Sequence, residues 1–145
     1  MKNFNISLIV LLIINSNLLA KEISGFPHII DGDTVKIFNK RIRLHGIDAP
    51  EKKQVCVKNS TEYSCGKKAT IALVKKIDGK KVLCEVQNNL DRYKRYIGVC
   101  FVGEVNLNKW LVRNGHAVAY RRYSKDYIED EKIKSVKPFP KQKHR

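Results

Sequence analysis

The chain has 145 residues, of which 29 are lysine or arginine and 14 are aspartate or glutamate, so its formal net charge is +15. This length suits one domain with a single modest core and leaves no room for a second domain of ordinary size. The charge favours a polyanionic partner such as nucleic acid or an anionic membrane, although solubility alone also explains a basic secreted protein.

Residues 1–20 have the features of a secretory signal peptide. Lys2 provides a basic start, residues 6–14 are largely apolar, and Ala20 offers a cleavage site. The apolar run is too short to span a bilayer, which takes about 20 residues. We therefore expect a secreted or periplasmic protein with its domain at residues 21–135, and an uncleaved membrane anchor is the alternative.

The first half of the chain predicts three β-strands. Residues 23–30 are mildly apolar and form the first, and residues 35–44 form two more around a turn at Asn39-Lys40. Apolar residues alternate with basic ones in this second stretch. Such alternation predicts one face toward a core and one polar face, so Arg43 should point away from the apolar side.

Four cysteines behind a signal peptide predict two disulfides, for which three connectivities exist. Their spacing does not resemble a zinc site. Cys84 and Cys100 lie on two predicted neighbouring strands, and they face each other if those strands pair antiparallel. Cys56 and Cys65 then form the second bridge and close a polar surface segment.

Strands and helices of the remaining chain predict the fold class. The expected elements begin with a helix at 66–77 that ends at Asp78-Gly79, followed by strands at 81–86 and 96–102 that are joined by a loop. A helix from Asn106 to Gly115 and a short segment at 116–120 come next. The chain then has a helix at 126–135, opened by a capping box of Asp126 and Glu129, and a basic tail at 136–145. This order predicts a mainly β, α+β protein: a five-stranded OB-fold barrel with about three flanking helices.

Carboxylates gather at the two ends of the hairpin predicted at 35–44. Asp31 and Asp33 precede it, and Asp48 and Glu51 follow it. Because a hairpin brings its ends together, these acids can converge and supply what a hard divalent cation requires. Each pair alone also has an explanation as a turn. Both pairs together, with an arginine between them, predict a metal and acid/base site.

Arginines complete the predicted chemistry. A metal and a carboxylate base suffice to activate water, and a bidentate guanidinium matches the negative charge that gathers on phosphate oxygens during hydrolysis. Arg43 is one candidate for this role. The segment 91–95 is the source of a second, and a solvated basic loop is the alternative reading of that segment.

Four separate motifs, in the same order along the chain, resemble those of the staphylococcal nuclease (thermonuclease) family. They are Ile30-Asp31-Gly32-Asp33-Thr34-Val35, Arg43-Leu44-x-Gly46-Ile47-Asp48-Ala49-Pro50-Glu51, Asp91-Arg92-Tyr93-x-Arg95, and Asn106-Leu107-x-x-x-Leu111-Val112 with Gly115. The resemblance implies an OB-fold endonuclease that depends on Ca²⁺ and cleaves DNA and RNA to products with 3′-phosphates. We expect it to act as a monomer without a stable protein partner.

The resemblance also implies roles by position. One Ca²⁺ would be bound by Asp33, Asp48 and the backbone carbonyl of Ala49, with Asp31 in the outer coordination shell. The catalytic residues would be Glu51 as general base and Arg43 and Arg95 as ligands of the scissile phosphate. The nucleotide site would be lined by Tyr93, Tyr120 and Arg92.

Three positions depart from the family pattern. Ala49 replaces a common threonine, which costs little if only its carbonyl binds the ion. Lys94 replaces a glycine, and if the backbone there has a positive φ, lysine costs roughly 1 kcal/mol or shifts Arg95. The third helix is also short. Lys94 and the short helix favour the alternative function, a non-catalytic OB-fold that binds nucleic acid through its charge and aromatic residues.

Overall fold

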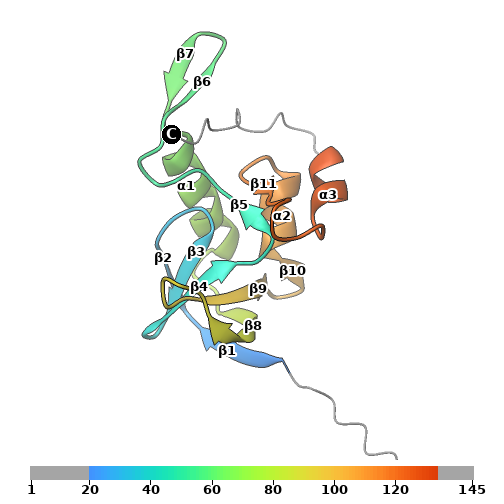
Figure 1. Cartoon of the computed structure of the whole chain (residues 1–145). Coiled ribbons are helices and arrows are strands. Elements are labelled where there is room, and N and C mark those ends of the chain that lie inside the picture. The colour runs from blue at the N-terminus through green and yellow to red at the C-terminus, as the bar shows by residue number, and fades with distance from the viewer. Residues whose placement is uncertain (1–19, 134–145) are drawn as a thin grey trace, which may run out of the picture.

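The computed structural model describes residues 20–133 of the chain (Figure 1). The predicted signal peptide, apart from Ala20, and the basic tail at 136–145 lie outside the described residues. Over the part that is described, no helix is long and apolar enough to cross a membrane.

The main sheet has seven short strands, whereas five were expected. Listed as they lie side by side, they are β1 (Lys21–Gly25), β8 (Val82–Leu90), β9 (Tyr96–Val102), β4 (Lys40–Leu44), β3 (Thr34–Ile37) and β2 (Pro27–Ile29), with β10 (Val105–Asn106) paired to β9. Strands β4 and β9 run parallel, and the other pairs run antiparallel.

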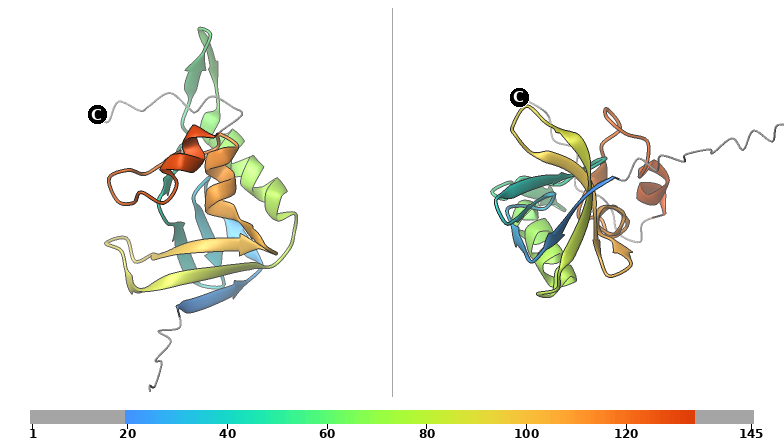
Figure 2. Two further views of the ribbon diagram at one scale, coloured as in Figure 1. Left: turned by 90° about the vertical axis from the view of Figure 1, so that its right-hand side faces the viewer. Right: turned by 90° about the horizontal axis from the view of Figure 1, so that it is seen from below.

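A bend at Phe26 closes the sheet. Strands β1 and β2 are separated by this one residue, yet they lie at opposite ends of the strand order, so the single strand predicted at 23–30 is divided in two. One residue cannot bridge a flat sheet whose strands lie about 4.8 Å apart. The sheet is therefore strongly curled (Figure 2), although β1 and β2 do not pair with each other. Gly25 permits this approach, because a Cβ there would lie 2.7 Å from Ile37.

The β3–β4 hairpin has the predicted alternation. Its turn lies at Phe38-Asn39, one residue earlier than predicted, and Phe38 has a φ of 52°. Arg43 lies on the partly exposed face. The apolar face is at most 1% exposed and consists of Val35, Ile37, Ile42 and Leu44. Each such side chain contributes about 1.5–3 kcal/mol of burial free energy, so the hairpin anchors the core.

Residues 20–133 contain three helices, as predicted: α1 (Cys65–Ile77), α2 (Leu107–Arg113) and α3 (Ile128–Lys132) (Figure 1). Helices α1 and α2 pack beside the sheet, and α3 packs against α2 and β11. Helix α1 ends at Asp78 in the left-handed conformation, with a φ of 52°. The Asn106 side chain caps α2 by accepting the Lys109 N–H at 2.9 Å. Together with the curled sheet, these helices form a mixed α+β fold of the OB type.

The predicted capping box of α3 is wrong. The helix begins after Tyr127, and no side chain caps it. The Asp126 carboxylate instead contacts Nε2 of His45 at 3.1 Å. The ring of Tyr127 packs against Gly46, where a Cβ would lie 3.0 Å from it. Burial of Tyr127 in the core therefore determines where this helix begins.

Two small sheets lie outside the main one. Strand β5 (Ile47–Asp48) pairs with β11 (Val118–Ala119), and β6 (Cys56–Lys58) pairs with β7 (Thr61–Tyr63). The second of these is a hairpin within the polar surface segment between Cys56 and Cys65, and it projects from the body of the protein (Figures 1 and 2).

Both predicted disulfides are present. Cys84 and Cys100 lie opposite each other in the antiparallel pair of β8 and β9, as expected. Cys56 and Cys65 form the other bridge. It joins the start of β6 to the start of α1, so both ends of the projecting hairpin are tied to the body.

Candidate functional site

The bend between β2 and β3 brings two carboxylates to one end of the barrel. Oδ1 of Asp31 accepts the N–H of Asp33 at 3.0 Å, which gives the bend its shape. Gly32 lies between them, and a Cβ there would be 2.8 Å from the Cβ of Ala49 and 2.9 Å from that of Ala69. Because only glycine leaves enough space, the bend can lie directly against the segment that follows β5.

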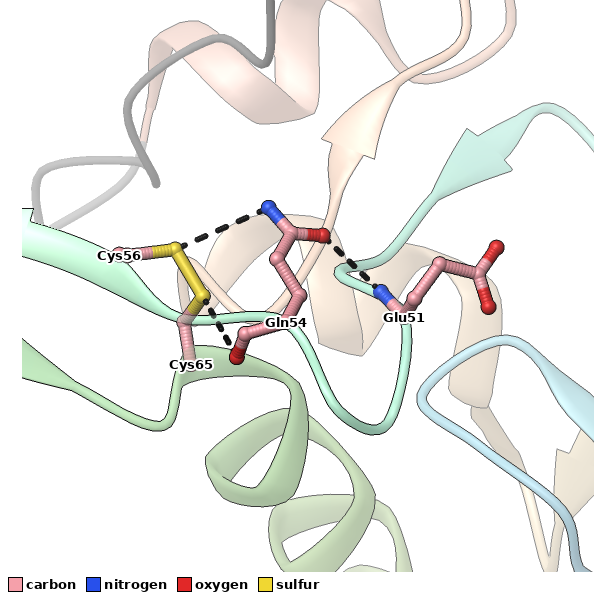
Figure 3. The surroundings of a disulfide bond; sticks show 4 residues. All are labelled: Glu51, Gln54, Cys56 and Cys65. Atoms are coloured by element: carbon pink, nitrogen blue, oxygen red, sulfur yellow. Dashed lines mark hydrogen bonds between the residues drawn. A yellow bond between two sulfur atoms is a disulfide. The ribbon is translucent and has the colours of Figure 1, made fainter.

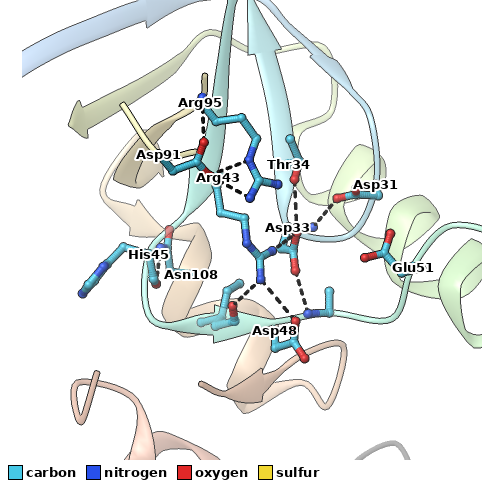
Figure 4. A network of polar contacts seen from close by, with 12 residues as sticks. Asp31, Asp33, Thr34, Arg43, His45, Asp48, Glu51, Asp91, Arg95 and Asn108 are labelled. Carbon is cyan, nitrogen blue, oxygen red and sulfur yellow. Dashed lines mark hydrogen bonds and ion pairs between the residues drawn. The ribbon is translucent and has the colours of Figure 1, made fainter. Parts of the chain in front are cut away.

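Arg43 joins the two acidic segments (Figure 4). Its guanidinium pairs with Asp33 and also with Asp48, where Nη2 lies 3.1 Å from Oδ1. Nη2 also donates to the carbonyl of Ile47 at 3.3 Å. Burial alone would lower the pKa of Arg43, but the charges and hydrogen bonds of Asp33 and Asp48 outweigh it and raise this pKa. Asp33 and Asp48 thus converge on Arg43 in the structure, and their role in catalysis stays a prediction.

Glu51 adds a fourth carboxylate beside the bend, and Figure 4 shows it near Asp31 and Asp33. Burial raises the pKa of Asp31, and the negative charges of Asp33 and, to a smaller degree, Glu51 raise it further. This end of the barrel therefore holds more acid than the adjacent Arg43 can neutralise. A bound cation would stabilise such an arrangement.

The donor atoms here fit a hard divalent cation. Asp33, Asp48 and the Ala49 carbonyl offer oxygen ligands, which Ca²⁺ prefers. Among residues 20–133, no three His, Cys, Asp or Glu side chains form a group that could hold a metal ion. Because Ca²⁺ takes about six to eight oxygens, an ion on this donor set would also need water or phosphate ligands. The carbonyl ligand and the outer-shell role of Asp31 stay predictions.

The loop between β8 and β9 is built around Asp91. Its Oδ1 accepts the N–H groups of Tyr93 and Arg95, both at 2.9 Å, and its Oδ2 lies 2.8 Å from Nη2 of Arg95. Lys94 has a φ of 59°, so it does adopt the left-handed conformation that glycine would favour. Arg95 keeps its pairing with Asp91 all the same.

Arg95 lies in the loop directly before β9, the strand next to the one that carries Arg43. Strands β9 and β4 run side by side, with Ile97 opposite Arg43. In the view of Figure 4, the Arg95 guanidinium, paired with Asp91, lies above that of Arg43, which lies beside Asp33 and Asp48. The structure thus brings together the two arginines that were predicted to bind the phosphate.

Asp91 should make stability depend on pH. Burial raises the pKa of Asp91, but hydrogen bonds from the backbone and side chain of Arg95 and from the Tyr93 backbone outweigh it and lower this pKa. The pKa of Asp91 in the native protein is thus below its unfolded value of about 3.9. The ionised carboxylate therefore stabilises the fold fully when the pH is above the unfolded pKa, and this stabilisation is lost as the pH falls through the native pKa.

We therefore expect the difference in unfolding free energy between wild type and Asp91→Asn to shrink as pH falls from 7 to 3, in urea denaturation. The exposed Glu62 on β7 offers a control, Glu62→Gln. A difference for Asp91→Asn that stays constant over this pH range would contradict the assignment.

The predicted nucleotide-binding residues have different surroundings. Tyr93 is 54% exposed, and the guanidinium groups of Arg92 and Arg95 lie 4.8 and 5.1 Å from its ring centre. Tyr120 follows β11, and its ring packs on Tyr123 at 4.8 Å. Strand β11 pairs with β5, the strand that carries Asp48. Tyr120 therefore lies on the side of the site formed by β5, whereas Tyr93 lies in the β8–β9 loop. Their common role in nucleotide binding stays a prediction.

Two polar residues that position the site were missed. Asn108 is fully buried; it donates to the carbonyl of His45 at 2.9 Å and accepts the N–H of Cys100 at 3.1 Å. It thereby ties α2 to the end of β4 and to β9. Arg41 donates to the carbonyl of Tyr93 at 2.7 Å and so holds the loop. The one sequence signal for this role of Arg41 is that it lies on the same face of the strand as Arg43, two residues away.

Comparison with known families gives one clear match. Residues 41–144 match the family described as staphylococcal nuclease homologue. This range includes Arg43, Asp48, Glu51 and Arg95, and it begins after the bend that carries Asp31.

Three curated relatives are similar to the chain, and two of them are named as nucleases. The chain is 38% identical over 102 residues to the succinoglycan biosynthesis protein ExoI of Rhizobium meliloti (strain 1021), covering 68% of the chain but only 53% of that protein. It is 32% identical over 126 residues to an uncharacterized endonuclease of Escherichia coli O157:H7, covering 83% of the chain and 76% of the relative. It is also 37% identical over 93 residues to the probable staphylococcal-like nuclease CAN2 of Oryza sativa subsp. japonica, covering 64% of the chain and 23% of that protein.

Proposed function

The chain belongs to the staphylococcal nuclease homologue family, and we propose that it is a Ca²⁺-dependent endonuclease that hydrolyses DNA and RNA to products with 3′-phosphates. One observation carries the proposal: Asp33 and Asp48 converge on Arg43 beside Glu51. A base, oxygen ligands for a cation and a guanidinium are thereby close enough to act on one phosphodiester.

The proposed mechanism divides the reaction among these residues. Glu51 takes a proton from the attacking water, whose oxygen forms a new bond to phosphorus. The bond from phosphorus to the 5′-oxygen breaks, and this oxygen takes a proton from solvent water. One product therefore keeps a 3′-phosphate, and the other carries a 5′-hydroxyl. Arg43 and Arg95 bind the phosphate oxygens as negative charge develops on them. Asp33, Asp48 and the Ala49 carbonyl would hold Ca²⁺, which supplies further positive charge at this phosphate.

A digestion assay tests this function. We expect the protein to cleave end-labelled single-stranded DNA and RNA in Ca²⁺, to stop on addition of a chelator, and to resume in excess Ca²⁺. Phosphatase treatment should change the mobility of products that carry a 3′-phosphate. Asp48→Asn should require more Ca²⁺ for half-maximal rate, whereas Asp126→Asn, outside the acidic cluster, should not. Cleavage that continues in the chelator would contradict the role of Ca²⁺.

The alternative is a non-catalytic nucleic-acid-binding protein. Lys94 favours it, because this residue has a φ of 59° in the loop that carries Arg95. Salt-sensitive DNA binding without product after long incubation in Ca²⁺ would support this reading. We further propose secretion through residues 1–20 and action as a monomer on polyanionic substrates, which suits the net charge of +15.

A further inference from the structure

The backbone of Glu51 is held by Gln54, a residue that no sequence pattern singled out. Oε1 of Gln54 accepts the N–H of Glu51 at 3.0 Å (Figure 3). The N–H of Gln54 in turn donates to the carbonyl of Glu51 at 2.7 Å. One residue thus occupies both main-chain polar groups of Glu51.

Gln54 is itself fixed by the disulfide next to it. Its Nε2 donates a long hydrogen bond to Sγ of Cys56 at 3.8 Å, and its carbonyl oxygen lies 3.5 Å from Sγ of Cys65 (Figure 3). The same carbonyl accepts the N–H of Gly66 at 3.2 Å. The cysteines are 4% and 0% exposed, so the bridge is an inner support of this turn.

The start of α1 also lies against Glu51. A Cβ at Gly66 would be 1.7 Å from the carbonyl oxygen of Glu51 and 2.9 Å from the carbonyl carbon of Lys52. Only glycine allows this approach. Since Cys65 is the first residue of α1, the disulfide holds the helix at the point where it meets Glu51.

Glu51 depends on such local contacts. Residues 49–55 belong to neither a helix nor a strand, so no ladder of hydrogen bonds orients them. A general base acts only within hydrogen-bond reach of the water that it deprotonates. Supporting side chains therefore have to hold its position to within about 0.5 Å.

We propose that Gln54 is a positioning residue for Glu51, and that the Cys56–Cys65 disulfide keeps Gln54 in place, so that catalysis requires this disulfide. The inference rests on the proposed nuclease function. It means that the enzyme gains full activity only after oxidation of these two cysteines, as occurs in an oxidising compartment. The Cys84–Cys100 bridge joins two barrel strands and should support stability alone.

The first test compares substitutions of Gln54. Gln54→Leu removes the acceptor for the Glu51 N–H, and we expect kcat to fall about 10- to 100-fold while KM changes less than about twofold. Gln54→Glu keeps an acceptor oxygen for the Glu51 N–H, so this variant should retain most of the wild-type kcat. Because the substitution adds a charge near Glu51, its kcat should be measured at the pH where this variant is most active. Equal kcat in wild type and Gln54→Leu would overturn the role of Gln54.

The second test is a double-mutant cycle. Cys56→Ala/Cys65→Ala should lower kcat by a factor similar to that of Gln54→Leu, and the combined variant should lose no more, because both changes act through one set of contacts. Cys84→Ala/Cys100→Ala is the control; it should lower the melting temperature but keep kcat well below that temperature. Losses that multiply in the combined variant would overturn the link between the disulfide and Gln54.

A third measurement needs no catalysis. Hydrogen exchange of the Glu51 amide, followed by NMR, should be slow in wild type and in the Cys84→Ala/Cys100→Ala control, and faster in Gln54→Leu and Cys56→Ala/Cys65→Ala. Unchanged exchange in those last two variants would overturn the inference even if the protein is a nuclease. If wild type cleaves no nucleic acid, the proposed function fails, whereas the exchange experiment still decides how Glu51 is held.

Discussion

Glu51→Gln is expected to lower kcat for DNA cleavage by about 10²- to 10⁴-fold, the usual contribution of a positioned general base. The substitution keeps the size of the side chain and removes its ability to take a proton. KM should change little, because the proposed phosphate ligands are Arg43 and Arg95. Glu51 is exposed, so the fold should not change.

Steady-state kinetics in saturating Ca²⁺ and a thermal melt of each variant would measure these effects. Glu62→Gln is the matched control: it makes the same chemical change at an exposed position on β7. We expect it to retain the wild-type rate. A rate for Glu51→Gln within a few-fold of wild type would rule out Glu51 as the base.

Arg43→Lys is expected to lower kcat/KM by about 10²- to 10³-fold, the loss that follows removal of one transition-state donor. Lysine keeps the positive charge but lacks the planar fork that binds two phosphate oxygens at once. It also cannot span Asp33 and Asp48 as the guanidinium does. Arg113→Lys, which alters an ion pair with Asp130 in the α2–α3 contact, is the control and should keep full activity.

Arg43→Met separates the structural role of the guanidinium from its catalytic role. It leaves the buried Asp33 without its partner, and such a loss costs about 3–5 kcal/mol of unfolding free energy. Because Ca²⁺ would replace the missing positive charge, added Ca²⁺ should stabilise this variant more than wild type in urea denaturation. Equal stabilisation of the two proteins would place the ion elsewhere.

Most residues of the proposed site could be selected from sequence because they lie in short local patterns. Alternation along 35–44 determines which way Arg43 points, since side chains of a strand change face at every residue. The same argument pairs Cys84 with Cys100 across two adjacent strands. The left-handed backbone at Lys94 agrees with the glycine that the family resemblance places there.

Other features arise from contacts between residues that are distant in sequence. The bend at Phe26 makes two strands out of one because the sheet has to close, and no local pattern carries that requirement. Asp126 has the sequence context of a helix cap, yet its carboxylate contacts His45, which lies far away in the chain. Asn108 resembles an ordinary polar residue of a helix, although it is fully buried between α2 and β9.

The amino-acid sequence by itself determined the chemical identity of the site: which acids, which arginines and which cysteines are present, and on which face of a strand Arg43 lies. The tertiary structure decided how these groups are held. Gly66 lies against the carbonyl of Glu51 where α1 begins, and the disulfide joins this start of α1 to the start of β6, close to the turn at 51–54. Such contacts depend on where whole elements pack, and periodicity within one element contains no information about that.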